Sequence, residues 1–282
     1  MTRKVINFRK KEVKIKKTNK RSYLAFPYYI ILYGLIFLPF FIMMLYAFSK
    51  TSEGIFNIRF TLSNFSMFFN EKTFVRTMFE SLYIAFLATI ATLIIAYPLA
   101  YLITTTSKGK QVLLISLITA TMWVNLLISA NALKQITEMF FPNLLGSNFI
   151  LVLGNVYIFL PYMVLPIYTV LSKLDKSLIE SSYDLGANKF QTFIKVILPL
   201  SLSGVVSGSM MVFLPAATTL VIPKYLGDGK RTMIGNLIED AVLLSHNYGY
   251  GAAVSLVIGL ILVGFIILLK RVDKYEGVLG NE

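Results

Sequence analysis

Apolar runs separated by short polar segments make up the chain from Tyr28 onward. Six of these runs approach or exceed the ~20 residues that a helix needs to cross the hydrocarbon core of a bilayer. A helix satisfies its own backbone hydrogen bonds, so it is the form that an open chain takes in lipid. The pattern predicts an all-α membrane protein with six spans, at Tyr28–Phe48, Ser81–Thr104, Val112–Ala130, Phe149–Val170, Ile197–Ile222 and Tyr250–Leu269.

The polar segment Lys173–Pro199 separates two of the long apolar runs and reads KLDKSLIESSYDLGANKFQTFIKVILP. Within it, Ser177 is placed to cap a helix that begins near Leu178, with Glu180 completing a capping box. The residues expected to form the packing face of this helix are Leu178, Ile179, Ser182 and Leu185.

A second short helix is expected after a sharp turn in the same segment. Gly186 can adopt the left-handed conformation that ends a helix. Asn188 then begins the next helix, which Pro199 bends where it enters the membrane. Two short helices joined by a glycine predict a compact knob that binds a partner, rather than a catalytic pocket.

Composition agrees with a membrane protein. Of the 282 residues, 56% are hydrophobic and 15% are charged, and the mean hydropathy is +0.70, whereas soluble domains contain about a quarter charged residues. The chain has no cysteine, which excludes disulfides and cysteine-based metal sites. Its single histidine is His246, so we expect no metal site and no cofactor bound by this chain.

The net charge of +13 is concentrated in a predicted N-terminal tail, residues 1–27, which carries ten Lys and Arg. A basic segment before a membrane helix is typical of a cytoplasmic anchor on anionic lipid. Contact with RNA or with a protein partner is the alternative. With the N-terminus inside, nineteen Lys and Arg lie in the cytoplasm and eight outside. The distribution predicts a plasma-membrane protein with both termini and the Lys173–Pro199 segment in the cytoplasm.

The six predicted spans contain no Asp, Glu, Lys, Arg or His. Proton-coupled carriers and voltage sensors need such residues at membrane depth, so both classes are disfavoured. The spans also lack paired carboxylates, a nucleophile elbow and a His-rich face, which argues against an enzyme. Uphill transport therefore needs energy from another chain. A self-sufficient carrier or channel, including a sodium-coupled one, is the alternative.

Small residues and prolines in the predicted spans also carry information. The GxxxG pair Gly204 and Gly208 is typical of close helix packing, or alternatively lines a solute path. Four prolines are expected to kink or locally unwind their helices: Pro98, Pro161, Pro166 and Pro215. In the first outer loop, Ser49–Glu80, phenylalanines indicate short helices at the membrane interface.

The polar segment resembles the signature loop of ABC importer permeases, E-A-A-x3-G-x9-I-x-L-P. The residues that match in register are Glu180, Gly186, Leu198 and Pro199. Small or isosteric replacements stand at Ser181, Ser182 and Val196. The resemblance implies that the loop docks on an ATP-hydrolysing subunit and transmits its closure, and an ordinary amphipathic connector is the alternative. The residues thereby assigned to coupling are Glu180, Ser181, Ser182, Asp184, Leu185, Gly186, Ala187 and Pro199.

Further stretches resemble the spermidine/putrescine permeases, a subgroup of that family. They include Tyr97-Pro-Leu-Ala-Tyr101, Trp123-Val-Asn-Leu-Leu-Ile128 and Leu160-Pro-Tyr-Met-Val-Leu-Pro166. The resemblance implies a permease domain over residues 28–282, a sister permease, two copies of an ATPase and an extracytoplasmic binding protein. It also implies that ATP and magnesium are used by the ATPase rather than bound by this chain.

A polycationic substrate needs carboxylates and aromatic faces along its path. The candidates in this chain are Trp123, Asn125, Tyr157, Tyr162, Glu239 and Asp240. Packing or interface anchoring is the alternative for the aromatic residues, and a solvated face or a binding-protein dock for the carboxylates. The chain departs from the subgroup at Ser129, Lys224 and Asn247-Tyr248, where arginine, an acidic residue and Asp-Trp are usual. Iron, sulfate, phosphonate and other small solutes are therefore alternative substrates.

Overall fold

The computed structural model describes residues 22–50 and 60–272. In this part, the regular structure is helical, with an isolated antiparallel bridge between Ser49 and Phe60. The chain forms two compact units, residues 1–43 and residues 44–282, and each is described by itself. Most of the predicted basic tail and the middle of the first outer loop lie outside the described residues.

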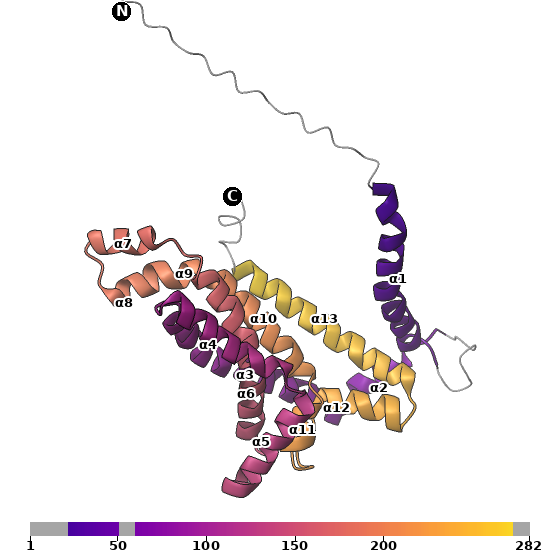
Figure 1. Cartoon of the computed structure of the whole chain (residues 1–282). Helices are drawn as coiled ribbons and strands as arrows, with labels where there is room; N and C mark the ends of the chain where they lie inside the picture. The colour runs from indigo at the N-terminus through magenta and orange to yellow at the C-terminus, as the bar shows by residue number, and fades with distance from the viewer. Residues whose placement is uncertain (1–21, 51–59, 273–282) are drawn as a thin grey trace, which may run out of the picture. The chain divides into compact units, whose positions relative to one another are not determined.

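The first unit contains most of helix α1 (Ser22–Ala47), drawn in indigo in Figure 1. From Pro27 to Ala47 this helix is long and apolar enough to cross a membrane. Its large apolar side chains are mostly exposed, which suits a surface that faces lipid or another helix rather than water. The first predicted span is confirmed as a helix.

Three helices form the centre of the second unit and pack against one another: α3 (Lys72–Thr104), α6 (Asn148–Leu171) and α10 (Leu202–Thr218). A Cβ atom at Gly204 would lie 3.0 Å from both the Cα atom of Ile167 and the carbonyl oxygen of Pro166. One at Gly208 would lie 3.1 Å from the carbonyl oxygen of Met163. The glycine pair therefore lets the backbones of α10 and α6 meet, and the packing interpretation is confirmed.

Shorter elements lie around these helices: α2 (Ser63–Asn70), η3 (Pro142–Leu144), α11 (Val221–Leu226), α12 (Ile234–Glu239) and the π-helical turn η5 (Asp240–Leu244). The last span is α13 (Tyr248–Val272), which contacts α2 and α10. Helix α2 is a short helix of the kind expected in the first outer loop, although residues 72–80 belong to α3. Phe68 in α2 is fully buried, so it packs inward rather than against lipid.

The third predicted span is not one straight helix. It consists of α4 (Lys108–Ala120), the 3-10 turn η2 (Thr121–Trp123) and α5 (Leu126–Phe140). The two helical parts meet at 95°. A hydropathy pattern does not detect this break, because the residues on both sides of it are apolar.

The break in the third span has a local cause at Asn125. Its backbone is extended, and its side-chain oxygen accepts a hydrogen bond from the backbone N–H of Leu127 at 2.8 Å. An asparagine in this position starts a new helix. Helix α5 then runs beyond the predicted end of the span and includes Lys134 and Glu138, a partly exposed ion pair at 3.3 Å.

The fifth predicted span is also bent, close to Pro199, where a bend was expected. Three elements precede α10 as one continuous helix: α8 (Lys189–Thr192), the π-helical turn η4 (Phe193–Ile197) and α9 (Leu198–Leu200). This helix meets α10 at 63°, with the break at Ser201. By contrast, α3, α6 and α10 continue through all four prolines that were expected to kink or locally unwind them, so the helices are not locally unwound there. The alternative expectation, a kink at each proline, stays a prediction.

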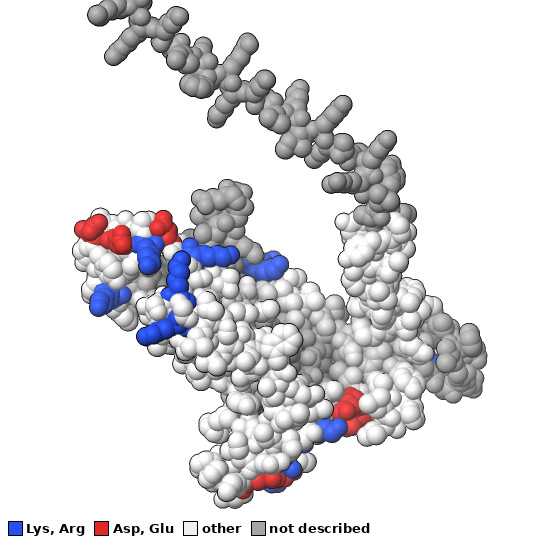
Figure 2. Space-filling view, in the orientation of Figure 1, with Lys and Arg blue, Asp and Glu red and all other residues white. Residues whose placement is uncertain are grey.

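The described residues contain four helices that could each span a membrane, and two bent pairs that bring the total to six. Figure 1 shows α8 and α7 (Lys176–Asp184) together at one end of the second unit. On the face drawn in Figure 2, charged side chains gather at this end and near α5 and α12, with uncharged surface between. Two charged ends around an uncharged band are typical of a membrane protein.

Candidate functional site

The knob formed by α7 and α8 begins with a different cap from the one expected. Asp175, not Ser177, caps α7, and its carboxylate accepts a hydrogen bond from the backbone N–H of Ser177 at 2.9 Å. This bond lowers the pKa of the Asp175 carboxyl below its ordinary value. The predicted helix start near Leu178 and the capping box with Glu180 are therefore wrong.

Packing explains why the helix begins earlier. Leu174 and Ile179 flank the Asp175 cap at the spacing of a hydrophobic staple. Both side chains are partly buried against the core of the bundle. Burying them fixes the angle at which the chain enters α7, and the first residue able to cap in that register is Asp175.

The turn and the second helix of the knob form as predicted. Gly186 has a φ of +82°, and the N–H groups of Gly186 and Ala187 bond back to carbonyl groups in the last turn of α7. Asn188 caps α8, and its side chain and backbone exchange hydrogen bonds with Gln191 at 2.8 and 3.0 Å. The sequence contains a capping box, but it belongs to α8 and not to α7.

A hydrogen bond between side chains joins the two helices of the knob. The hydroxyl oxygens of Ser182 and Thr192 are 2.8 Å apart, and both residues are buried. Ser182 therefore packs inward as expected, as does Ile179, whereas Leu178 and Leu185 are exposed and do not belong to the packing face. The serine in place of the signature alanine thus makes a contact that an alanine lacks.

We expect Thr192→Val to loosen the knob and Thr192→Ser to leave it nearly unchanged. Valine keeps the volume of threonine but removes the partner of the Ser182 hydroxyl, at a cost of about 1 kcal/mol. Hydrogen exchange of the amides in residues 176–192 measures this opening. Faster exchange in the valine variant alone is the expected result, and equal exchange in the two variants would contradict it.

The tip of the knob exposes two large apolar side chains. Leu185 is 88% exposed and Phe190 is 71% exposed. The predicted coupling residues that are exposed on the knob are Glu180, Ser181, Asp184, Leu185 and Gly186. Of these, Glu180 lines a cavity that faces the end of α3 and the start of α4. Ala187 is half-buried and Ser182 is buried, while Pro199 lies in α9 beyond η4. The structure therefore separates the predicted coupling residues into an exposed tip and an internal support.

The predicted path residues lie in two separate places. Tyr157 and Tyr162 of α6 line a cavity of about 270 Å³ beside the bend between α4 and α5. Ser129 lines it from α5. Trp123 is 91% exposed and does not line this cavity, and the side chain of Asn125 is engaged in capping α5. Two of the four aromatic and amide candidates are thus brought together.

The two predicted carboxylates line a different cavity, of about 290 Å³, next to α12 and η5. Glu239 lies 3.7 Å from the Nζ atom of Lys224, and Asp240 is exposed. Arg231 lines the same cavity. A lysine and an arginine beside two carboxylates reduce the attraction of this cavity for a cation.

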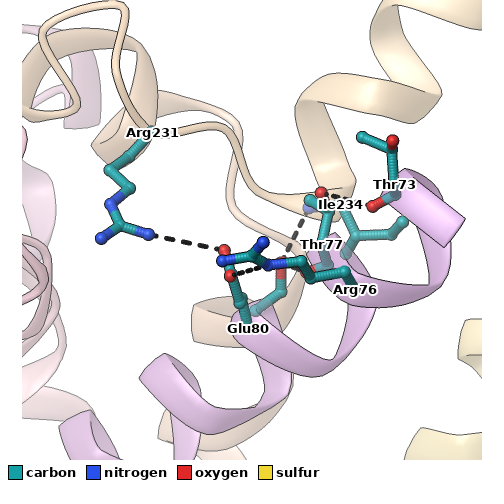
Figure 3. Close-up of polar contacts among 7 residues, drawn as sticks. Thr73, Arg76, Thr77, Glu80, Arg231 and Ile234 are labelled. Carbon is teal, nitrogen blue, oxygen red and sulfur yellow. Dashed lines mark hydrogen bonds and ion pairs between the residues drawn. The ribbon is translucent and has the colours of Figure 1, made fainter.

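Glu80 makes polar contacts that were not predicted from the sequence. Figure 3 shows it between two arginines, with Oε1 2.8 Å from Nε of Arg76 and Oε2 3.6 Å from Nη1 of Arg231. The adjacent Ser81 hydroxyl oxygen accepts a hydrogen bond from the backbone N–H of Ile234 at 2.8 Å. These contacts fasten the start of α12 to α3. The i,i+4 spacing of Arg76 and Glu80 was the one signal in the sequence.

Most of the chain matches known proteins. Residues 15–275 match the family described as binding-protein-dependent transport system inner membrane components. The chain belongs to this family. The permease is thus a multi-pass component of the plasma membrane, and the resemblance of the chain to ABC importer permeases is confirmed.

Two curated relatives show which members of the family the permease is similar to. The permease is 32% identical over 229 residues to the spermidine/putrescine transport system permease protein PotB of Haemophilus influenzae, covering 76% of this chain and 80% of the relative. It is 31% identical over 236 residues to PotB of Escherichia coli, covering 76% and 83%. The sequence resemblance to spermidine/putrescine permeases is therefore confirmed as a relationship.

Solved structures confirm the fold. A chain of a bacterial ABC transporter involved in the import of alginate superposes with a TM-score of 0.69 and 14% identity, covering 91% of the permease and 97% of that chain. A chain of an inward-facing methionine ABC transporter gives a TM-score of 0.54 and 18% identity, covering 71% and 92%. The all-α ABC importer permease fold predicted from the sequence is thus shown.

Proposed function

We propose that this permease is the membrane subunit of an ATP-driven importer and that its knob docks on a separate ATPase subunit. The observation that carries the proposal is the exposure of Leu185 and Phe190 on a polar, well-capped knob. Large apolar side chains exposed among charged ones are typical of a protein interface. The knob is the element through which the energy of ATP hydrolysis reaches the membrane helices.

The coupling residues have two roles in this proposal. The exposed tip, from Glu180 to Gly186, contacts the ATPase. Ser182 and the turn at Ala187 keep the two helices at a fixed angle, and Pro199 lies in the helix that leads to the bend at Ser201. A rigid knob transmits a displacement that a flexible loop would absorb.

The proposed orientation places the knob and both termini in the cytoplasm. It is supported by the nineteen Lys and Arg on that side against eight on the other. The importer contains a sister permease, two copies of the ATPase and an extracytoplasmic binding protein that docks at the opposite end. ATP and magnesium are bound by the ATPase and not by this chain.

The proposed substrate is a polyamine such as spermidine or putrescine. Relatives at 31 and 32% identity carry these substrates in their names, and the cavity beside Tyr157 and Tyr162 offers aromatic faces to an alkylammonium group. Another small solute is the second candidate, because Lys224 lies 3.7 Å from Glu239 and weakens the case for a cation path at that cavity.

Uptake by the complete transporter in liposomes tests this function. We expect spermidine or putrescine, delivered by the binding protein, to stimulate ATP hydrolysis and to accumulate inside only when ATP is present. Liposomes that contain this permease alone should show no flux. Flux without ATP would support a self-sufficient carrier instead, and stimulation by another solute but not by polyamines would contradict the polyamine assignment.

A further inference from the structure

The motif Tyr97-Pro-Leu-Ala-Tyr101 near the end of α3 meets the helix that carries the knob. The rings of Tyr97 and Tyr101 both contact the ring of Phe193, with centroid distances of 5.6 and 5.7 Å and interplanar angles of 89° and 74°. Edge-to-face contacts of this kind are favourable for aromatic pairs. Phe193 is the first residue of η4. Helix α3 therefore contacts the chain just before the chain enters the helical core.

A hydrogen bond extends this contact to the bend. The hydroxyl oxygens of Tyr97 and Ser201 are 2.7 Å apart, and both residues are buried. The Ser201 hydroxyl also lies 3.1 Å from the carbonyl oxygen of Leu198 and donates to it. Since a serine has one proton to give, Tyr97 is the donor in its bond to Ser201. Tyr97 therefore touches both η4 and the 63° bend.

The segment that carries Phe193 is a π-helical turn, followed by α9 before Ser201. A π-helical turn closes i→i+5 hydrogen bonds, and such turns occur frequently at functional sites. Here η4 lies between the knob, which Ser182 and Thr192 hold together, and the bend at Ser201. The contacts of Tyr97 and Tyr101 thus lie on the one covalent route from the knob to α10.

We propose that Tyr97 and Tyr101 are positioning residues that receive the motion of the knob. They hold Phe193 and Ser201 so that a displacement of the knob moves α3 together with α10. Without the Tyr97 hydroxyl, the bend can move past α3, and less solute is imported for each ATP hydrolysed. This inference rests on the proposed docking of the knob on an ATPase. It adds the contacts that carry the motion of the knob onward to α3 and α10.

The test uses the complete transporter in liposomes and measures solute imported per ATP hydrolysed. Tyr97→Phe keeps the ring that contacts Phe193 and removes only the hydroxyl, while Ser201→Ala removes its partner. Each variant is expected to lower the ratio about fivefold, the size of one buried hydrogen bond. Because both remove the same bond, the double variant should be no worse than the worse single one.

Thr92→Val is the matched control. Thr92 is a buried residue of the same helix, but its hydroxyl bonds only to the carbonyl oxygen of Ala88 in the preceding turn. A ratio in Tyr97→Phe equal to that of the wild type, additive losses in the double variant, or an equal loss in Thr92→Val would each overturn the proposal. Failure of the wild-type complex to couple ATP to import would contradict the proposed function instead, so the two failures are distinguishable.

Discussion

Leu185→Asp is expected to abolish ATP-driven import while the permease remains folded. The Leu185 side chain is 88% exposed, so an aspartate there loses no core packing in the isolated chain. In the proposed interface the same carboxylate would be taken out of water without a partner. Central apolar contacts of an interface contribute about 2 kcal/mol or more, which weakens binding at least about thirtyfold. Co-purification with the ATPase and uptake in liposomes measure the effect.

The conservative variant Leu185→Met is the control for this prediction. Methionine is apolar and similar in volume, so it should retain the ATPase and import. Thermal unfolding of the permease alone should be the same for both variants, because the side chain contacts water in the free chain. Normal ATPase binding by Leu185→Asp would contradict the docking proposal, as would equal losses in the aspartate and methionine variants.

Phe190→Asp, measured by co-purification with the ATPase and by uptake in liposomes, tests the other half of the exposed tip. Phe190 is 71% exposed and lies in α8, across the turn from Leu185. Asp at this position should have a similar effect if one partner covers both helices. Equal losses at Leu185 and Phe190 would show that the knob binds its partner as a single surface, and import unchanged by Phe190→Asp would contradict it.

Local signals predicted the knob better than they predicted the spans. Gly186 and Asn188 were placed correctly because a positive φ and a helix cap each depend on a few adjacent residues. The cap of α7 was misplaced because both Asp175 and Ser177 are good caps. The burial of Leu174 and Ile179 decides between them, and this burial depends on the rest of the bundle.

The break in the third span was missed because it occurs inside an apolar run, where hydropathy is uniform and carries no information on direction. The bend of the fifth span was expected at Pro199 and lies two residues later, at Ser201. The bend at Ser201 is supported by a hydroxyl on Tyr97, 104 residues away along the chain. The link between Ser81 and Ile234 spans 153 residues. Contacts between such distant residues are fixed by the packing of the helices and leave no periodic signal.

Replacing Gly204 by alanine, valine or leucine is expected to lower the stability of the permease more than any other substitution proposed. Atoms of the facing backbone lie 3.0 Å from the position of a Cβ atom there, at Ile167 and Pro166. Backbone cannot rotate away as a side chain can, so α10 must separate from α6. Overpacking costs about 1 to 3 kcal/mol, and the loss should increase from Ala to Val to Leu. Thermal unfolding of the purified permease in detergent measures the series.

Gly259 provides the matched control for this series. It lies in α13, also a span, and a Cβ atom there would meet nothing within 4 Å. The same substitutions should be neutral, and Ala should be slightly stabilising because glycine is a poor helix former. If the Gly204 and Gly259 series unfold at the same temperatures, the close packing of α10 against α6 is contradicted. If only the Gly204 series loses stability, the close approach of the α10 and α6 backbones at this glycine is supported.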